Sequence, residues 1–305
     1  MAEDYPKTMM ELESRFNTEA ACRSYLFALR WPEGFVCPRC QKTTAWPMAN
    51  GRWVCAGCRA QISVTAGTVF QDSKLPLTVW FRTMWQLTSQ KNGVSALGLQ
   101  RVLGLGSYKT AWTVLHKLRR AMVRPGRDRL QGIVEVDEAY WGGEEADGRG
   151  RQTYEKALIV VAAEADGQKI GRIRLRLIAD TSRKTLHGFI AEVVEPGSTV
   201  QTDGLQSYRE LQGYVHQRQV QSRQPEEAEH LLPRVHLVIS LLKRWLMGTH
   251  QGAIARDYLQ DYLDEFTFRF NRRTSASRGK LFYRLAQQAM QVPPTTYNSL
   301  GHHNQ

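Results

Sequence analysis

The sequence predicts a multidomain protein with three kinds of module: a small β module clamped by cysteines, an all-α module, and an α/β module with a mixed sheet. The first observation is length, because 305 residues exceed the about 100–200 residues of an ordinary domain. The second is a pair of Cys-x-x-Cys motifs near the N-terminus. The third is a change of period, from helical spacing before Pro125 to strand-like alternation after Gly132.

The composition indicates a folded protein with a polyanionic partner. Hydrophobic residues make up 42% of the chain and charged residues 23%, which is typical of globular proteins. Lys and Arg total 41 against 29 Asp and Glu, and the resulting charge of +12 favours nucleic acid as the partner. An anionic membrane surface is the alternative, but no Lys/Arg cluster flanks an apolar anchor.

The N-terminal sequence predicts a cytoplasmic protein. The first 30 residues lack the basic start and apolar run of a signal peptide, and no apolar stretch approaches the roughly 18 residues of a spanning helix. We therefore expect no membrane partner. In a reducing compartment, paired cysteines are more often metal ligands than disulfides.

Residues 1–30 are expected to form an N-terminal helical segment. Apolar side chains recur every three or four positions over 9–30, as in one amphipathic helix. Cys22 lies within this stretch and has no cysteine nearby, so it is most simply a small core residue.

Four cysteines predict a zinc ribbon over 31–72. Each two-residue gap lets one tight turn present two thiolates to a tetrahedral ion. The 14 residues between the two pairs suit a β-hairpin that turns at Asn50-Gly51 and returns the second pair to the first. Such a ribbon either contacts DNA or protein, or only stabilises a small fold, and the motif leaves both open. The expected zinc ligands are Cys37, Cys40, Cys55 and Cys58.

Residues 73–126 predict a helix-turn-helix module that ends at the Pro125-Gly126 linker. Helical patterns run over 75–90, 95–104 and 107–122. A long helix, a short helix, a turn containing glycine and a basic helix follow one another in helix-turn-helix proteins, whose last helix enters the major groove. Any three-helix bundle could produce the same pattern.

Basic side chains favour DNA binding by the last of these helices. Residues 101–130 hold eight Lys or Arg against one Asp, which suits contact with phosphates. The candidate DNA-contacting residues are Lys109, Lys117, Arg119 and Arg120.

From Gly132 the pattern predicts an α/β domain, which we place at 127–290. Three strands joined as two hairpins, a helix, a fourth strand and a further helix are expected. This is the order of the ribonuclease H-like fold, whose first and fourth strands pair in parallel through a helical crossover. The expected strands span 132–143, 156–165, 169–180 and 198–204, and the first helix spans 185–194.

Two aspartates in this sheet predict a divalent-cation site. Asp137 lies deep in the first strand and Asp203 at the end of the fourth, so parallel pairing brings them together although they are 66 residues apart. Two such carboxylates repel unless cations lie between them, and hard ions with oxygen ligands can activate a water or 3′-hydroxyl for phosphodiester chemistry. Taken singly, Asp137 could be a solvent-facing acid and Asp203 a turn residue.

Four motifs resemble those of bacterial insertion-sequence transposases that carry an N-terminal zinc ribbon and a DDE-type domain, the ISXO2-like, Merlin-related group. The resemblance runs from about residue 10 to about residue 290. It implies a DNA transposase that binds terminal inverted repeats, hydrolyses phosphodiester bonds with Mg²⁺ or Mn²⁺, and transfers the freed 3′-hydroxyl into target DNA. The motifs are VEVDEAYWGG (134–143), VQTDGLQSY (200–208), VHLVISLLKRWLMGTHQG (235–252) and YLDEFTFRFNRR (262–273).

The same resemblance supplies further active-site groups. In the family, the third acidic position varies among Glu, Asn and His and is followed seven residues later by Lys, which implies His236 and Lys243 here. Seven residues are about two helical turns, so both share one helix face. Lys243 would grip a phosphate, and His236 would bind the second metal ion or the scissile strand. Imidazole is a poorer Mg²⁺ ligand than carboxylate, which makes Mn²⁺ an alternative. Alternatives to His236 are Glu226, Glu227 and Glu229.

Other residues of the last two motifs are assigned more simply. Arg244 and Arg272 join the candidate DNA contacts, whereas Asp264 and Glu265 are expected to be structural. An apolar stripe at helical spacing is expected to pack on the sheet rather than touch DNA. It consists of Leu263, Phe266 and Phe270.

The implied reaction also implies partners. Because two element ends must be paired, we expect a homo-oligomer on double-stranded DNA in the nucleoid, with a flexible tail over 291–305. Two other classes stay open. A domesticated, catalytically inactive DNA-binding regulator has no reason to keep Asp137 and Asp203. A ribonuclease H-like structure-specific nuclease or resolvase lacks a separate module for reading DNA ends.

Overall fold

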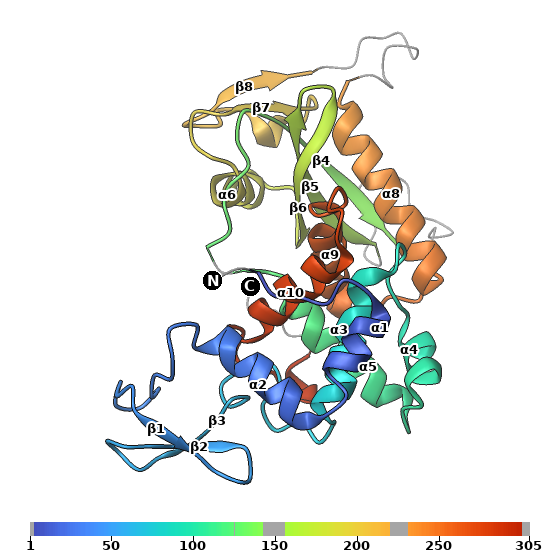
Figure 1. Cartoon of the computed structure of the whole chain (residues 1–305). Coiled ribbons are helices and arrows are strands. Elements are labelled where there is room, and N and C mark those ends of the chain that lie inside the picture. Colours follow the sequence, from blue (N-terminus) through green and yellow to red (C-terminus); the bar gives the residue numbers. More distant parts are fainter. Residues whose placement is uncertain (1–2, 125, 143–155, 220–230, 301–305) are drawn as a thin grey trace. The chain divides into compact units, whose positions relative to one another are not determined.

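The computed structural model describes residues 3–124, 126–142, 156–219 and 231–300 (Figure 1). The chain forms two compact units. The first, which we call the helical unit, comprises Met1–Arg124 and Thr274–Gln305. The second, the sheet unit, comprises Pro125–Arg273.

An aromatic core holds the helical unit together. Phe282 is fully buried and packs edge-on against Phe81 at 5.6 Å between ring centroids, while Phe16 packs on Phe81 at 4.8 Å. Burying such rings is a large source of stability in a domain of this size. The helices that carry this core and its surroundings are α1 (Met9–Arg15), α2 (Glu19–Arg30), α3 (Leu77–Ser89), α4 (Ala96–Leu103), α5 (Tyr108–Arg120) and α10 (Arg278–Ala289).

The single helix expected over 9–30 is two helices in the structure. The side chain of Thr18 accepts a hydrogen bond from the N–H of Ala21 and so caps a new helix start, α2, after α1 has ended at Arg15. The helical spacing continues across the break, which is why periodicity alone missed it. Cys22 is fully buried, as expected of a core residue.

The zinc-ribbon segment is a three-stranded antiparallel sheet. Strands β1 (Ala45–Pro47), β2 (Arg52–Cys55) and β3 (Gln61–Ser63) follow in order. The β1–β2 hairpin turns where Asn50-Gly51 was expected to turn it, and Gly51 has a φ of 76°, which glycine adopts without strain. Trp53 stacks on Phe27 of α2 at 4.4 Å, which anchors the ribbon to the helices.

Helices α3, α4 and α5 follow one another with well-formed ends. Ser95 caps α4 through the N–H of Gly98, and Ser107 caps α5 through the N–H of Thr110. Gly104 ends α4 with a φ of 62°. A long helix, a short helix and a third helix therefore follow in the predicted order, an order that any three-helix bundle can share.

The sheet unit is built on a five-stranded mixed sheet in the order β6-β5-β4-β7-β8. β4 pairs antiparallel with β5 and parallel with β7, and β7 pairs parallel with β8. This topology, with α6 (Arg183–Val193) as the crossover, is consistent with a ribonuclease H-like domain. The strands are β4 (Ile133–Trp141), β5 (Ala157–Asp166), β6 (Lys169–Ile178), β7 (Thr199–Thr202) and β8 (Val215–Arg218).

Helices cover both faces of this sheet (Figure 1). On one face α6 packs through residues such as Phe189 against Val134 and Val136 of β4. On the other face lie α8 (Pro233–His250) and α9 (Arg256–Phe270), which pack against β5 and β6. The expected apolar stripe is buried on this second face, with Leu263, Phe266 and Phe270 all in its core.

The C-terminal part of the chain differs from expectation in two ways. The sheet unit ends at Arg273, not at residue 290, because the next helix, α10, contributes Phe282 to the aromatic core of the helical unit. Part of the expected flexible tail is also ordered. It forms a short 3-10 turn, η2 (Tyr297–Ser299), and Leu300 is 4% exposed. Residues 301–305 and Pro125 of the expected linker lie outside the described residues.

Candidate active site and metal centre

Two neighbouring strands bring Asp137 and Asp203 side by side. In the parallel pairing of β4 with β7, Val136 pairs with Thr202, so Asp137 follows on β4 and Asp203 is the first residue after β7. Neighbouring strands lie about 4.8 Å apart, and residues at matching positions point to the same face. Asp137 faces the α8 side of the sheet, where His236 contacts it, and Asp203 lies close enough to act on its charge although 66 residues separate the two aspartates in sequence.

The carboxylate of Asp137 is partly buried, with 17% of its side chain exposed. Its Oδ1 accepts a hydrogen bond of 2.8 Å from the N–H of Glu138. Burial raises the pKa of Asp137 above its ordinary value, the N–H of Glu138 and His236 lower it, and the Asp203 carboxylate raises it. A cation placed against this group would relieve both the burial of the charge and the repulsion from Asp203.

His236 reaches Asp137 from the first turn of α8. Its Nε2 lies 3.1 Å from Oδ2 of Asp137, across 99 residues of sequence. Nearly half of the imidazole is exposed. Ser240 and Lys243 continue along the same exposed helix face, and Lys243 lies about 10 Å further along the axis at 1.5 Å per residue. The structure thus joins His236 to Asp137 directly and leaves Lys243 exposed along the same helix face.

Asp203 lies at the start of a turn that is tied to β4. Its Oδ1 accepts from the N–H of Leu205 at 2.9 Å. The turn continues into η1 (Gln206–Tyr208), where the hydroxyl of Tyr208 donates to Oε1 of Glu138 at 2.5 Å. Tyr208 is fully buried, and burial raises the pKa of this phenol well above its ordinary value. Tyr208 therefore stays protonated and holds the Asp203 turn against β4.

The carboxylates of Asp137 and Asp203 fit a hard divalent cation. Mg²⁺ in proteins is commonly held by one or two carboxylates, with waters and substrate phosphates completing its shell. Asp137 on the central strand β4 and Asp203 directly after the inner strand β7 supply such carboxylates, and both residues are partly exposed. Among the described residues, three or more candidate ligand atoms gather within 4.8 Å only at the cysteines, so Asp137, Asp203 and His236 do not form a closed cage.

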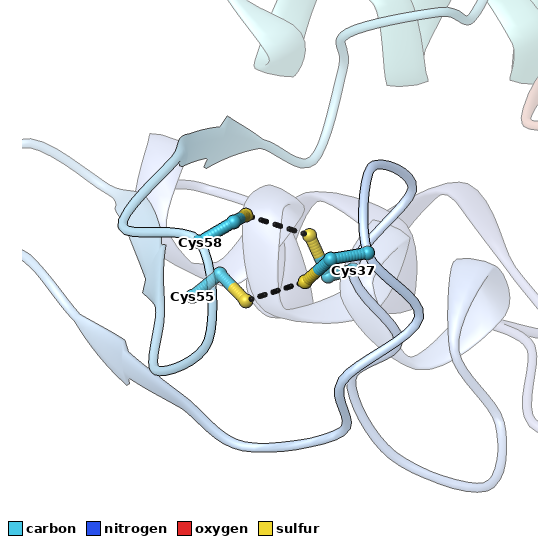
Figure 2. A group of neighbouring side chains, drawn as sticks. Cys37, Cys55 and Cys58 are labelled. Carbon is cyan, nitrogen blue, oxygen red and sulfur yellow. Dashed lines mark hydrogen bonds between the residues drawn. The ribbon is translucent and has the colours of Figure 1, made fainter.

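The four cysteines expected to bind zinc form a compact cluster. Their Sγ atoms all lie within 4.8 Å of one another, with Cys37 and Cys58 at 3.7 Å and Cys40 and Cys55 at 3.5 Å (Figure 2). Four thiolates at about 2.3 Å from one ion would stand about 3.8 Å apart in a tetrahedron. The cluster therefore has the size of a Cys₄ zinc site, and it supports zinc binding.

The candidate DNA contacts fall into two groups. Lys109 and Arg244 are exposed. Lys117 and Arg120 are partly buried, and burial lowers the pKa of Lys117. Arg272 is also partly buried, with its guanidinium over the Phe268 ring at 3.9 Å. A side chain that packs against its own domain offers less of its charge to a phosphate.

Arg119 is a correction to the sequence analysis. Its side chain is 1% exposed, and its guanidinium lies 3.2 Å from Nε2 of His116 inside the helical unit. The residue carries the charge expected of a phosphate contact, but helix packing turns it inward. Arg119 is therefore not a surface contact for DNA.

The other acidic residues named in the sequence analysis are either buried or outside the described residues. Asp264 and Glu265 are buried in α9, with exposures of 9% and 0%, so their assignment as structural residues agrees with the structure. Glu226, Glu227 and Glu229, the alternatives to His236, lie outside the described residues. Sequence reasoning gave no role to Glu135 or Tyr208, because their partners are distant in sequence.

Two protein-family models match the chain. Residues 129–271 match the ISXO2-like transposase domain. This part of the chain is similar to that transposase domain. Residues 17–61 match the transposase zinc-ribbon domain and contain all four clustered cysteines. The residues that match the transposase domain run from β4 to α9 and include Asp137, Asp203 and His236.

A relative extends the similarity over most of the chain. A protein of Halobacterium salinarum, described as an uncharacterized protein in transposable element ISH50, is 27% identical over 286 residues. The alignment covers 86% of this chain and 93% of the relative. The similarity therefore includes the helical unit as well as the transposase domain.

A solved structure aligns more weakly. One chain of a simian T-cell lymphotropic virus intasome in complex with PP2A regulatory subunit B56 gamma aligns with 66% of this chain and 74% of its own length, at 14% identity. Its TM-score of 0.29 is too low to support a conclusion about the sheet unit.

Within the described ranges, no helix has the length and hydropathy of a membrane-spanning segment.

Proposed function

We propose that this chain is a DNA transposase of an insertion sequence. It would cleave phosphodiester bonds at the ends of its element and join the freed 3′ ends to target DNA. The observation that carries the proposal is the position of Asp137 beside Asp203 at one edge of a transposase-family domain. An inactive DNA-binding regulator would gain nothing from a second carboxylate that raises the pKa of Asp137.

The proposed metal site uses the two aspartates. Asp137 and Asp203 would hold Mg²⁺ or Mn²⁺ through carboxylate oxygens. When bound, such an ion supplies Lewis-acid activation of a water or 3′-hydroxyl and stabilises charge on the leaving oxygen. The backbone N–H of Glu138 and the tethered turn around Leu205 keep the two carboxylates oriented toward that position.

His236 and Lys243 would act beside the metal site. The hydrogen bond from His236 to Asp137 orients that carboxylate, while the half-exposed ring stays accessible to DNA. Lys243 and Arg244 follow on the exposed side of α8, where Lys243 can bind a phosphate as a point charge and Arg244 through its planar guanidinium. These residues would hold the scissile strand next to the carboxylates of Asp137 and Asp203.

The helical unit would supply recognition of the DNA ends. The exposed residues of α5 lie at its N-terminal end, where Tyr108 is 52% exposed and Lys109 is also exposed. In helix-turn-helix proteins, the N-terminal residues of the last helix contact base edges. We therefore assign end recognition to this part of α5, with the protein acting as a homo-oligomer because two ends must be paired.

The test uses the full-length chain and labelled DNA that carries the inverted repeats flanking its own coding region. Asp137→Ala and Asp203→Ala are each expected to abolish Mg²⁺-dependent nicking while binding to the labelled ends stays within about twofold, because neither residue belongs to the helical unit. Nicking is read on denaturing gels and binding by mobility shift.

Asp166→Ala is the matched control, because Asp166 is an exposed aspartate of the same sheet at the far end of β5. It should nick at the wild-type rate. Retained nicking in both active-site variants would refute the assigned metal site.

A further inference from the structure

A buried glutamate holds the start of α8 against strand β4. Glu135 is 1% exposed, and both of its carboxylate oxygens are used. Oε2 accepts from the backbone N–H of Arg234 at 2.7 Å and of Val235 at 2.9 Å, and Oε1 accepts from the Arg234 guanidinium at 2.8 Å. One side chain therefore binds three donors from the first turn of a helix about 100 residues away in sequence.

This contact replaces the cap that α8 lacks. The residue before the helix is Leu232, which makes no side-chain capping bond, and Pro233 has no N–H. The next two backbone N–H groups point at Glu135 instead. A carboxylate at a helix N-terminus interacts favourably with the helix dipole, and charge-assisted hydrogen bonds offset its burial.

The same contact fixes the position of His236. Glu135 and Asp137 lie on one face of β4, two residues and about 6.6 Å apart along the strand. Val235 and His236 are consecutive in α8. When Glu135 holds the N–H of Val235, the next side chain reaches Asp137, and His236 does so at 3.1 Å.

We propose that Glu135 is a positioning residue of the active site, which clamps the first turn of α8 and thereby holds His236 against Asp137. The inference rests on the proposed function, because it gives Glu135 a part in the same reaction. Glu135 does not touch the substrate and acts through His236. Partners outside the immediate ligand set of a metal site commonly change metal affinity or activity by about 10–100-fold when they are replaced.

The sheet contains a matched glutamate that makes similar contacts elsewhere. Glu164 on β5 accepts from the backbone N–H groups of Gln131 and Arg172 and from the Arg172 guanidinium. Its strand partner is Val134, three positions before Asp137, and its hydrogen bonds within the described residues go to Gln131 and Arg172 rather than to α8. Replacing Glu164 therefore removes an equivalent set of bonds without touching His236.

The experiment is a double-mutant cycle on the full-length chain. Glu135→Gln, which keeps the shape of the side chain, is expected to slow single-turnover nicking about 10–100-fold while DNA binding stays unchanged. Combined with His236→Ala, it should add less than about twofold to the loss from His236→Ala alone, because both changes remove one arrangement. Glu164→Gln should leave nicking within about threefold, and its effect should multiply with that of His236→Ala.

A second measurement does not depend on activity. Hydrogen–deuterium exchange is followed in the peptide that covers residues 232–240. Glu135→Gln should speed exchange there at least about fivefold, because two helix amides lose an anionic acceptor, whereas Glu164→Gln should not. Thermal melts confirm that each variant is folded, and Glu135→Asp replaces Glu135→Gln if the glutamine variant is not.

The outcomes separate this inference from the proposed function. Multiplicative losses for Glu135→Gln and His236→Ala, or unchanged exchange at 232–240, would overturn the positioning role. A wild-type chain that binds DNA but never nicks it would instead count against the proposed function, and the exchange measurement would still decide whether Glu135 clamps α8.

Discussion

At the level of single residues, Asp137 is charged in a place that disfavours charge. Burial and the nearby Asp203 both raise the pKa of Asp137. The folded state therefore binds this proton more tightly than the unfolded state does. The folded state loses stability as the pH rises from the pKa of the unfolded carboxyl through the higher pKa of the folded one, and the loss persists above that range.

Asp137→Asn should therefore raise the melting temperature of the protein at neutral pH without added Mg²⁺. In a domain of this size each kcal/mol corresponds to about 2–4 °C. Added Mg²⁺ should raise the melting temperature of the wild type and leave that of the variant unchanged. Scanning calorimetry measures both effects, with Asp166→Asn as the exposed control. A variant that melts lower than the wild type would contradict this account.

The sequence could locate the acids of the site but not their supports. Asp137 and Asp203 were predicted because strand order places them together whatever their surroundings. Glu135 resembles any acid in a strand, and its role depends on donors about 100 residues away. Arg119 shows the opposite error, because a basic residue on a basic helix looks exposed until tertiary packing buries it against His116.

At the level of elements, α10 shows what periodicity cannot decide. Its apolar spacing predicts a helix equally well in either unit. Its partner is chosen by shape, since Phe282 fits among the rings of the helical unit. Near its start, Gly279 is buried and the N-terminal segment passes close over it, so that a Cβ at this position would overlap the carbonyl oxygen of Pro6.

Gly279→Ala should therefore destabilise the protein, although alanine normally favours a helix. Overpacking of this kind costs about 1–3 kcal/mol. The matched control is Gly188→Ala in α6, where nothing lies within 4 Å of the new methyl group and alanine should stabilise by up to about 1 kcal/mol. Urea denaturation of both variants makes the comparison. A stabilised Gly279→Ala would show that Pro6 does not pass over α10.

Strand β8 was missed for a related reason. Its four residues, Val215–Arg218, are short and largely polar, without the alternation that identifies a strand. Pairing with β7 supplies what the local sequence lacks, from Thr199 opposite Val215 to Thr202 opposite Arg218. Edge strands of this kind are specified by their neighbour rather than by their own composition.

At the level of the whole molecule, the cysteine cluster predicts a separable dependence on metal. Purified protein should contain about one zinc ion per chain. Protein without bound zinc would contradict the assignment of a zinc ribbon. A zinc-selective chelator should speed hydrogen exchange over residues 37–63 and leave residues 133–202 unchanged, because the ribbon relies on the ion while the sheet unit has its own apolar core.

The division of the chain has a consequence for how its parts can be handled. The chain leaves the helical unit at Arg124 and re-enters it at Thr274, so the sheet unit is an insertion that splits the helical unit in two. After a single backbone break at either junction, the sheet unit is still joined covalently to one of the two segments of the helical unit. A fragment that stops at Arg124 would also lack Phe282. The rings of Phe16 and Phe81, which pack against Phe282 in the intact chain, would then be exposed to solvent.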